Sequence, residues 1–273
     1  MRRGGALALA ALLVTLVAGC GGGGGKSGSG EPHTNDAFYG VISAEPLPGP
    51  AELARLGEGG AGTLRVNLAW GSVQPGPDAP YDWGHYDPVI LGAAQHGVRV
   101  LATVYSTPSW ATPMAEIPPL GSSLPGFEDF VQAAARRYGP EGTLWQHHPD
   151  APKLAITTWQ VWNEPNSPLF WKPSPDAGRY LSLLRGFDSA LRGVDPQARI
   201  LIGGLFPTPR GGIPMGDFLT DLYEGGGRKL FDAVAIHPYA RTPRDAIDRI
   251  AQMRQVMRRF GDDGKPIWVT EVG

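Results

Sequence analysis

Two glutamates lie in segments that suit acid–base and nucleophilic chemistry. Glu164 lies in Trp-Gln-Val-Trp-Asn-Glu-Pro-Asn (residues 159–166), and Glu271 lies in Ile-Trp-Val-Thr-Glu-Val-Gly (residues 267–273). Two carboxyl groups can divide one reaction between them. A protonated carboxyl group gives its proton to a leaving oxygen, while an ionised carboxylate attacks the electron-poor carbon. This division requires surroundings that push the two pKa values apart.

The segments that must position these glutamates alternate between strand and helix character from Phe38 onward. Seven short apolar runs have strand character, and they are continuous rather than alternating, which is typical of parallel strands covered on both faces. The runs are residues 39–42, 64–68, 98–104, 156–162, 200–203, 233–236 and 267–269. Glu164 and Glu271 therefore stand where the fourth and seventh strands end.

Helical patterns lie between the strand runs. Tyr180, Leu184, Phe187, Leu191 and Val194 recur at the spacing of one helix face. A second apolar stripe occupies residues 127–138. Thr-Pro-Arg-Asp at residues 242–245 predicts a helix start, with a capping threonine, a proline in the first turn and an acid close behind.

Strands that alternate with helices predict an α/β fold with a parallel sheet. An open doubly wound sheet and a (β/α)8 TIM barrel are the two candidates. Ser-Ala-Glu-Pro at residues 43–46 follows the first strand and is no glycine-rich phosphate loop, so dinucleotide binding is unsupported. Seven strands in steady succession favour the barrel. We expect a barrel truncated after strand 7, without helix 7, strand 8 and helix 8; a genuine seven-stranded barrel is the alternative.

Composition narrows the class of protein. The chain has 273 residues, of which 42% are hydrophobic and 18% charged, and this supports one globular domain with a sizeable core. The formal net charge is −2, and no basic run follows the extreme N-terminus, so we expect no nucleic-acid partner. The single cysteine, Cys20, rules out an intrachain disulfide.

The N-terminus has the features of an export signal. Arg2 and Arg3 precede an apolar run from Ala6 to Ala18. That run suits the core of a signal peptide and is short for a membrane span, which needs about 20 residues. Val-Ala-Gly-Cys at residues 17–20 resembles the bacterial lipobox, in which the cysteine is lipidated after cleavage.

The same region predicts how the chain is organised and where it resides. We expect a lipoprotein signal peptide over residues 1–19, and a lipidated Cys20 with a glycine- and serine-rich flexible tether over residues 20–35. The incomplete barrel domain occupies residues 36–273. This organisation implies an exported protein anchored in the membrane and facing away from the cytoplasm; an ordinary secretory signal is the alternative.

The two glutamate segments resemble the acid/base and nucleophile motifs of clan A glycoside hydrolases, with families 39 and 5 the nearest in character. Trp-Asn-Glu-Pro-Asn is the more specific motif, and the resemblance runs over residues 38–273. It implies a retaining hydrolase that cleaves O-glycosidic bonds of oligo- or polysaccharides through a covalent intermediate. Glu164 would be the acid/base and Glu271 the nucleophile. Members of the clan cleave β-linkages and α-L-arabinofuranosides.

The resemblance also implies residues that bind substrate or support the nucleophile. Asn163 stands where the clan hydrogen-bonds the sugar 2-hydroxyl, and Arg65 resembles the strand-two arginine that keeps the nucleophile ionised. His237 and Tyr239 follow strand six, and either side chain could hydrogen-bond the nucleophile. The alternatives are a loop-capping asparagine, a surface ion pair and a structural histidine.

Aromatic residues near the loops are candidate sugar platforms, because an indole can stack on the apolar face of a pyranose. Trp70, Trp110 and Trp171 qualify by position, with packing of loops against the barrel as the alternative. The clan often adds a platform from strand eight, which the seven runs do not include. A truncated chain would therefore be an incomplete enzyme and can be inactive.

Neither a metal nor an organic cofactor is expected. His147 and His148 are adjacent but have no further ligands at a recognisable spacing.

Two other functions remain open beside the hydrolase. One is a membrane-tethered glycan-binding lipoprotein without hydrolysis. The presence of both Glu164 and Glu271 weighs against it, since a binding module has no use for a proton donor opposite a nucleophile. The other is a transglycosidase that uses the same residues with a sugar acceptor in place of water.

Overall fold

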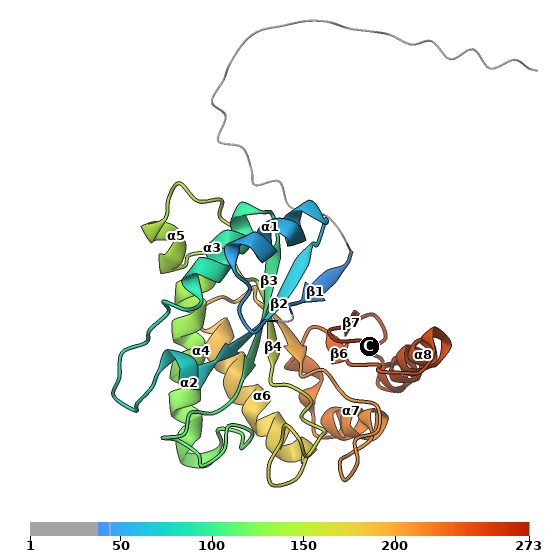
Figure 1. Cartoon of the computed structure of the whole chain (residues 1–273). Helices are drawn as coiled ribbons and strands as arrows, with labels where there is room; N and C mark the ends of the chain where they lie inside the picture. The colour runs from blue at the N-terminus through green and yellow to red at the C-terminus, as the bar shows by residue number, and fades with distance from the viewer. Residues whose placement is uncertain (1–37, 44, 273) are drawn as a thin grey trace, which may run out of the picture. The chain divides into compact units, whose positions relative to one another are not determined.

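The computed structural model describes residues 38–43 and 45–272, and within them strands alternate with helices as the sequence predicts (Figure 1). The predicted signal peptide, Cys20 and the tether lie outside the described residues. The strands are β1 (Gly40–Ile42), β2 (Thr63–Ala69), β3 (Arg99–Tyr105), β4 (Thr158–Val161), β5 (Arg199–Ile202), β6 (Val234–Ile236) and β7 (Ile267–Val269). The helices are α1 (Pro50–Glu58), α2 (Trp70–Val73), α3 (Asp87–Gln95), α4 (Leu124–Tyr138), α5 (Thr143–His147), α6 (Ala177–Arg192), α7 (Met215–Glu224) and α8 (Pro243–Arg259), with short 3-10 turns at η1 (Gly121–Ser123) and η2 (Gly227–Lys229).

All strand pairs are parallel and follow chain order, which confirms the predicted α/β fold. One sheet runs β1-β2-β3-β4-β5, and β6 pairs with β7 in a second sheet. Only isolated bridges, Leu201 to Ala233 and Leu205 to Ile236, join β5 to β6, so the ladder is irregular there. Among the described strands, β1 and β7 each have one neighbour. The truncation of the barrel after strand 7 therefore stays a prediction.

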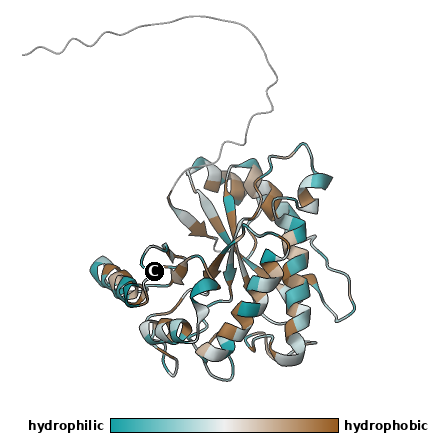
Figure 2. Cartoon of the chain, turned by 180° about the vertical axis from the view of Figure 1, so that it is seen from behind, coloured by the Kyte–Doolittle hydropathy of each residue, from teal (hydrophilic) through white to brown (hydrophobic). Residues whose placement is uncertain are grey.

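Successive residues of each strand face two different cores. One set packs outward against the helices, and Figure 2 shows hydrophobic colour on the strands and a mixture of hydrophobic and hydrophilic residues on the helices. The other set packs inward, where a small apolar cluster fills the space inside the sheet. Its members are Leu101, Leu201, Ala233 and Ala235, with Trp268 packed against them. Further along the strands, the inward face becomes polar.

Helix α6 fixes the spacing of β4 and β5 at their carboxyl ends. Arg199 N bonds Thr157 O, and the same register would bring Gly203 N to Val161 O. The Tyr180 hydroxyl occupies that place instead. It accepts from Gly203 N and donates to Val161 O, each at 2.8 Å. The two strands therefore separate around a side chain from the helix layer.

The boundaries of α6 and α8 follow their capping residues. Asp176 accepts from Arg179 N at 2.8 Å and begins α6. This helix ends at Arg192, so Val194 lies beyond it although the sequence pattern included it. Thr242 accepts from Asp245 N at 3.2 Å, which confirms the predicted start of α8.

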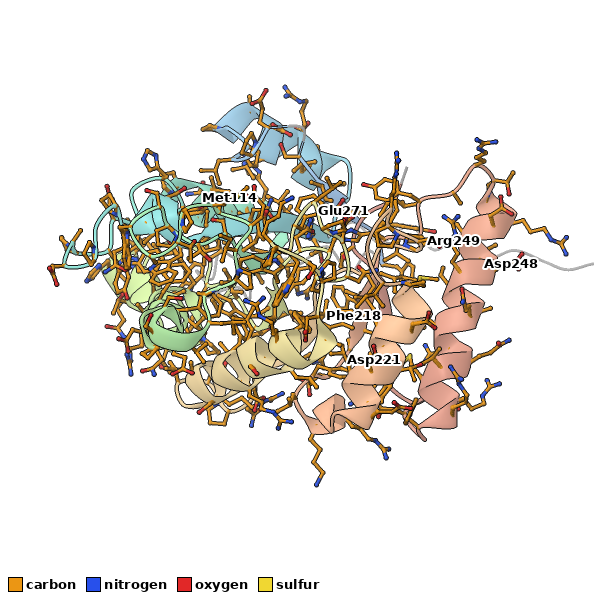
Figure 3. The ribbon with its side chains drawn as sticks, turned by 90° about the horizontal axis from the view of Figure 1, so that it is seen from below. Met114, Phe218, Asp221, Asp248, Arg249 and Glu271 are labelled. Carbon is orange, nitrogen blue, oxygen red and sulfur yellow. The ribbon has the colours of Figure 1, made fainter. Side chains whose placement is uncertain are left out.

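Residues of α7 and α8 that Figure 3 labels differ in their exposure to solvent. Phe218 of α7 is fully buried against Tyr180, with ring centroids 5.7 Å apart, whereas Asp221 of the same helix is exposed. Asp248 of α8 is also exposed. No helix within residues 38–43 and 45–272 combines the length and the apolar character needed to cross a membrane.

Candidate active site

Polar side chains from β2, β3, β4, β6 and β7 meet on the inward face of the sheet, above the small apolar cluster. Arg65 of β2 is the central cation. Its Nε donates to Gln160 Oε1 at 2.8 Å, Nη1 to Glu271 Oε1 at 2.6 Å and Nη2 to Asn163 Oδ1 at 2.9 Å. Its side chain is only 6% exposed, so this is a buried ion pair and not the surface pair of the alternative interpretation.

Glu164 lies in surroundings that favour its neutral form. It is 6% exposed, and burial raises the pKa of its carboxyl group to about 7, an increase that the Arg65 cation opposes. Its Oε1 lies 2.9 Å from His237 Nδ1. Burial lowers the pKa of His237 to about 4, so the imidazole is neutral at pH 7.

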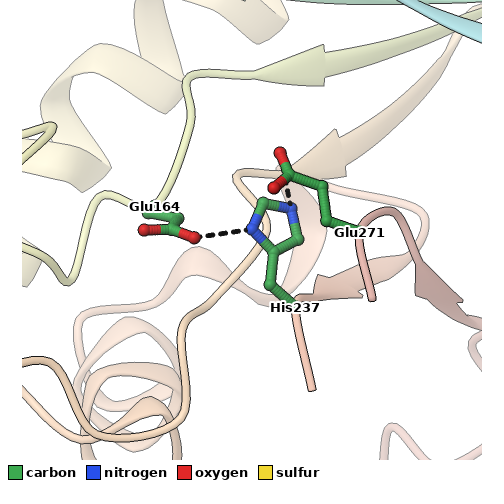
Figure 4. Close-up of side chains that lie close together, drawn as sticks. All are labelled: Glu164, His237 and Glu271. Atoms are coloured by element: carbon green, nitrogen blue, oxygen red, sulfur yellow. Dashed lines mark hydrogen bonds and ion pairs between the residues drawn. The ribbon is translucent and has the colours of Figure 1, made fainter. Parts of the chain in front are cut away.

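Glu271 accepts hydrogen bonds at both of its carboxyl oxygens. Oε1 accepts the Arg65 ion pair, and Oε2 accepts from the Tyr239 hydroxyl at 2.8 Å. Burial raises the pKa of Tyr239 to about 12, so the phenol keeps its proton and donates it in this bond. His237 Nε2 lies 3.6 Å from Glu271 Oε1. Of the two predicted candidates, Tyr239 makes the hydrogen bond to Glu271, and His237 lies between the two carboxyl groups (Figure 4).

The separation of the two carboxyl groups indicates which kind of reaction they can perform. One oxygen of Glu164, one of Glu271 and a ring nitrogen of His237 all lie within 4.8 Å of one another. Carboxyl pairs about 5–5.5 Å apart are typical of a nucleophile facing an acid, whereas a pair that activates water directly is about 6.5–9.5 Å apart. The observed spacing fits the first arrangement.

The backbone is strained where the chain leaves β3 and β4. Among the described residues, three that are not glycine have positive φ: Ser106 (76°), Trp162 (69°) and Glu164 (38°). Such conformations cost about 1–3 kcal/mol each and concentrate at functional sites. All three lie within three residues of a strand end that faces the two carboxyl groups. With these backbone conformations, the loop after β4 turns inward and the Glu164 side chain reaches His237 after β6.

The two asparagines of the Trp-Asn-Glu-Pro-Asn motif have different surroundings. Asn163 accepts from Arg65 through Oδ1, which leaves its Nδ2 as a donor. It is therefore no simple loop cap. Asn166 instead joins two loops, because its Nδ2 donates to Phe206 O and Ile213 O at 2.7 and 2.8 Å, and its Oδ1 accepts from Phe206 N at 3.0 Å. The motif thus contains one residue of the site and one that supports it.

Two of the three tryptophans predicted from the sequence as sugar platforms are buried. Trp70 and Trp171 are each 0% exposed, packed against Phe130 and Tyr180 respectively. This burial contradicts the prediction that they stack on a sugar, because a platform must expose a ring face. Trp110 is only partly buried, but its Nε1 donates to Gln74 O at 2.9 Å and ties two loops together.

A cavity opens at the carboxyl ends of β1 and β2. Its volume is about 410 Å³, within the ~300–1,000 Å³ common for ligand pockets. Asn67, Ser72 and His85 are among its lining residues. Asn67 stands two residues beyond Arg65 on the same face of β2 and is exposed, so the cavity adjoins the polar centre.

Three residues of the polar centre were missing from the sequence prediction. All three are buried: Gln160 and Thr270 join Arg65 to His237, and Thr103 donates to Gln160. A detectable signal was present, because each is a polar residue in or next to an apolar strand. Their sequence runs were interpreted as uniformly apolar, and this hid the inward-facing polar positions.

The residue types of Glu164, His237 and Glu271 would also suit a divalent metal. Their hydrogen bonds and the nearby guanidinium argue for a different use. The Arg65 cation lies 2.6 Å from Glu271, and a second cation there would be repelled. His147 Nδ1 lies 3.4 Å from Arg137 Nη1, and His147 is not a member of this group.

The fold matches a known architecture. The described chain has the parallel α/β architecture of clan A TIM-barrel glycosidases, with Glu164 and Glu271 after its fourth and seventh strands. No protein-family profile matches the sequence, and no curated protein matches it.

Solved structures give the particular likenesses. A family 39 glycoside hydrolase from the gut symbiont Bacteroides cellulosilyticus WH2 superposes with a TM-score of 0.65 at 22% identity, over 89% of this chain and 50% of its own. A monomeric β-xylosidase from Caulobacter crescentus CB15 gives 0.68 at 17%, over 89% and 54%. The endoglucanase Cel5A from Thermotoga maritima gives 0.57 at 17%, over 86% and 78%. The chain thus spans about half the length of the first two, and at these identities the likeness establishes the fold.

Gly204 provides a test of the packing around His237. A Cβ on Gly204 would lie 2.0 Å from His237 Nε2, so Gly204→Ala must displace the ring. We expect a loss of about 1–3 kcal/mol in the free energy of unfolding, measured with denaturant. An NMR titration should show the pKa of His237 rising from about 4 toward its usual value as the ring gains solvent.

Gly264→Ala is the matched control, because nothing lies within 4 Å of the Cβ position there. Neither stability nor the His237 titration should change in it. An unchanged His237 pKa in Gly204→Ala would contradict the close packing described here.

Proposed function

We propose that this protein is a retaining glycoside hydrolase, with Glu164 as acid/base and Glu271 as nucleophile. The observation that carries the proposal is a pair of carboxyl groups with different surroundings. One oxygen of Glu164 lies within 4.8 Å of one oxygen of Glu271. Burial raises the pKa of the Glu164 carboxyl group to about 7, whereas the Glu271 carboxyl group accepts hydrogen bonds from Arg65 and Tyr239. The likeness to solved glycosidases supports the same class.

The first chemical step uses both groups together. The Glu271 carboxylate attacks the anomeric carbon as the bond from that carbon to the leaving oxygen breaks. The proton of Glu164 moves to that oxygen, so the alcohol departs neutral. Glu271 is then an ester and Glu164 a carboxylate.

The second step returns both groups to their starting forms. The Glu164 carboxylate takes a proton from a water molecule, which attacks the anomeric carbon from the side that the alcohol left. The bond to Glu271 breaks, and the sugar is released with its original anomeric configuration. Arg65 and Tyr239 stabilise Glu271 as a leaving carboxylate.

Asn163 has a defined place in this scheme. Because Arg65 holds its Oδ1, the amide nitrogen is left as a donor for a substrate that binds beside the carboxyl groups. A sugar 2-hydroxyl there would accept this hydrogen bond, which strengthens as charge develops at the neighbouring carbon. The cavity beside Asn67 is a candidate space for the sugar on the same side.

The proposal is tested by turnover of aryl β-glycosides and an aryl α-L-arabinofuranoside. Glu271→Gln should nearly abolish turnover of any substrate, because no covalent intermediate can form. Glu164→Gln should cost roughly 10²–10⁴-fold on substrates with poor leaving groups and much less on dinitrophenyl glycosides, which need little protonation. Proton NMR of the first product formed should show retained configuration.

Glu58→Gln, at an exposed position on α1, is the matched control and should keep full activity. Equal losses on good and poor leaving groups would contradict the assignment of Glu164. Binding of glycans without any turnover would indicate a glycan-binding protein instead. Transfer to an added sugar acceptor, in preference to water, would indicate a transglycosidase with the same residues.

The pH dependence of kcat/KM follows from the raised pKa of Glu164. The acid form is required in the first step, so kcat/KM on a poor leaving group should be maximal below neutrality and fall as pH rises through about 7. In Glu164→Gln this limb should disappear, since no proton is lost there. A limb that persists near pH 7 in that variant would show that another group is responsible.

We also propose that the protein is exported and anchored to the membrane through lipid on Cys20, with its catalytic domain on the extracytoplasmic face. Support comes from the sequence of residues 1–35, where the single cysteine follows an apolar run. Cell fractionation tests this: the protein should be found with membranes, and Cys20→Ala should release it or leave it unprocessed. Equal membrane association of the two proteins, with the signal peptide removed from both, would contradict the lipid anchor.

A further inference from the structure

Gln160 uses its whole hydrogen-bonding capacity inside the sheet. It is 0% exposed, in the middle of the polar centre. Its Oε1 accepts from Arg65 Nε at 2.8 Å and from Thr103 Oγ1 at 3.0 Å. Its Nε2 donates to Thr270 Oγ1 at 3.2 Å and to Ile202 O at 3.3 Å. No other described side chain is hydrogen-bonded to both Arg65 and Thr270.

The orientation of this amide is dictated by its neighbour. A guanidinium nitrogen can donate but cannot accept, so the amide oxygen of Gln160 must face Arg65 Nε. Rotating the amide by half a turn would set its NH2 group against a cation. The amide nitrogen therefore faces Thr270 and must donate to it.

The directions of the next two hydrogen bonds, from Thr270 to His237 and from His237 to Glu164, follow in turn. Among the described residues, Thr270 Oγ1 has hydrogen-bond partners only in Gln160 Nε2 and His237 Nε2, and since Gln160 Nε2 can only donate, the hydroxyl proton has His237 Nε2, 3.1 Å away, as its acceptor. A neutral imidazole that accepts at Nε2 carries its proton at Nδ1. That Nδ1–H donates to Glu164 Oε1 at 2.9 Å.

We propose that Gln160 is a positioning residue that acts through Thr270 to hold His237 as its Nδ1–H tautomer. In that tautomer Oε1 of Glu164 is an acceptor, so the acid proton resides on Oε2, the oxygen that is free to meet the substrate. The opposite tautomer would accept at Nδ1 and draw the proton onto Oε1, away from the leaving oxygen. The tautomer itself follows from the contacts, whereas its catalytic consequence rests on the proposed function.

The decisive variant is Gln160→Glu, which preserves the shape and the acceptor for Arg65 but replaces the donor with a second acceptor. Arg65 keeps the new carboxylate ionised. Thr270 must then donate to this carboxylate and accept from His237 Nε2, so the ring proton moves to Nε2. Gln146→Glu, at an exposed position on α5, is the matched control.

The direct readout is long-range 1H–15N NMR of the intact protein with 15N-labelled histidine, which distinguishes the two tautomers. The His237 resonances are identified by their loss in His237→Asn. We expect Nδ1–H in the wild type and in Gln146→Glu, and Nε2–H in Gln160→Glu. If Gln160→Glu does not fold, Thr270→Val removes the same link and should leave a mixture of tautomers. An Nε2–H wild type, or a tautomer unchanged in both variants, overturns the proposal.

The kinetic readout separates positioning from a merely structural role. In Gln160→Glu, kcat/KM should fall roughly 10²-fold for a phenyl glycoside and less than about tenfold for the dinitrophenyl glycoside, since only the first needs the proton of Glu164. Equal losses on both would overturn the link to Glu164. The NMR result needs no turnover, so it decides the tautomer even if the wild type hydrolyses no glycoside and the proposed function fails.

Discussion

A guanidinium buried inside the sheet needs a partner for each direction in which it donates, and the site is organised around this requirement. Removing a charged group from water costs several kcal/mol unless its hydrogen bonds are replaced. Arg65 obtains its replacements from Gln160 on β4, Asn163 in the loop after β4 and Glu271 after β7. These contacts hold the ends of two strands, β4 and β7, at fixed distances from one cation on β2. The relative positions of the two glutamates follow from that arrangement.

The same cation affects the two carboxyl groups unequally, and this inequality separates their chemistry. Glu271 forms a direct ion pair with Arg65, whereas the effect of Arg65 on Glu164 is weaker than the effect of burial. His237, kept neutral by its own burial, adds no positive charge between them. Two side chains of the same type therefore have different electrostatic surroundings, because Glu271 has a salt bridge to Arg65 and Glu164 has the uncharged ring of His237 as its partner.

The sequence was sufficient to predict elements with a strong local pattern and residues with a specific motif. All seven strands were predicted within a few residues, because buried parallel strands form continuous apolar runs, and Glu164, Glu271, Arg65 and Tyr239 meet as the resemblance implied. The prediction that Trp70 and Trp171 are sugar platforms was wrong, because position next to a loop does not determine which way a large ring packs. Gln160 and Thr270 were missed because their importance lies in contacts across more than 30 residues of sequence. The break between β5 and β6 had no sequence signal at all.

Through the Tyr180 hydroxyl, the outer helix α6 affects the separation of two strands on the inside of the domain. By standing between Gly203 N and Val161 O, it acts as a spacer that sets how far β4 and β5 diverge just before the loop that carries Glu164. The aperture of the site is therefore partly a property of α6 and of whatever packs behind it. Evolution could adjust the width of the opening by repacking that helix, while every residue that meets the substrate stays the same.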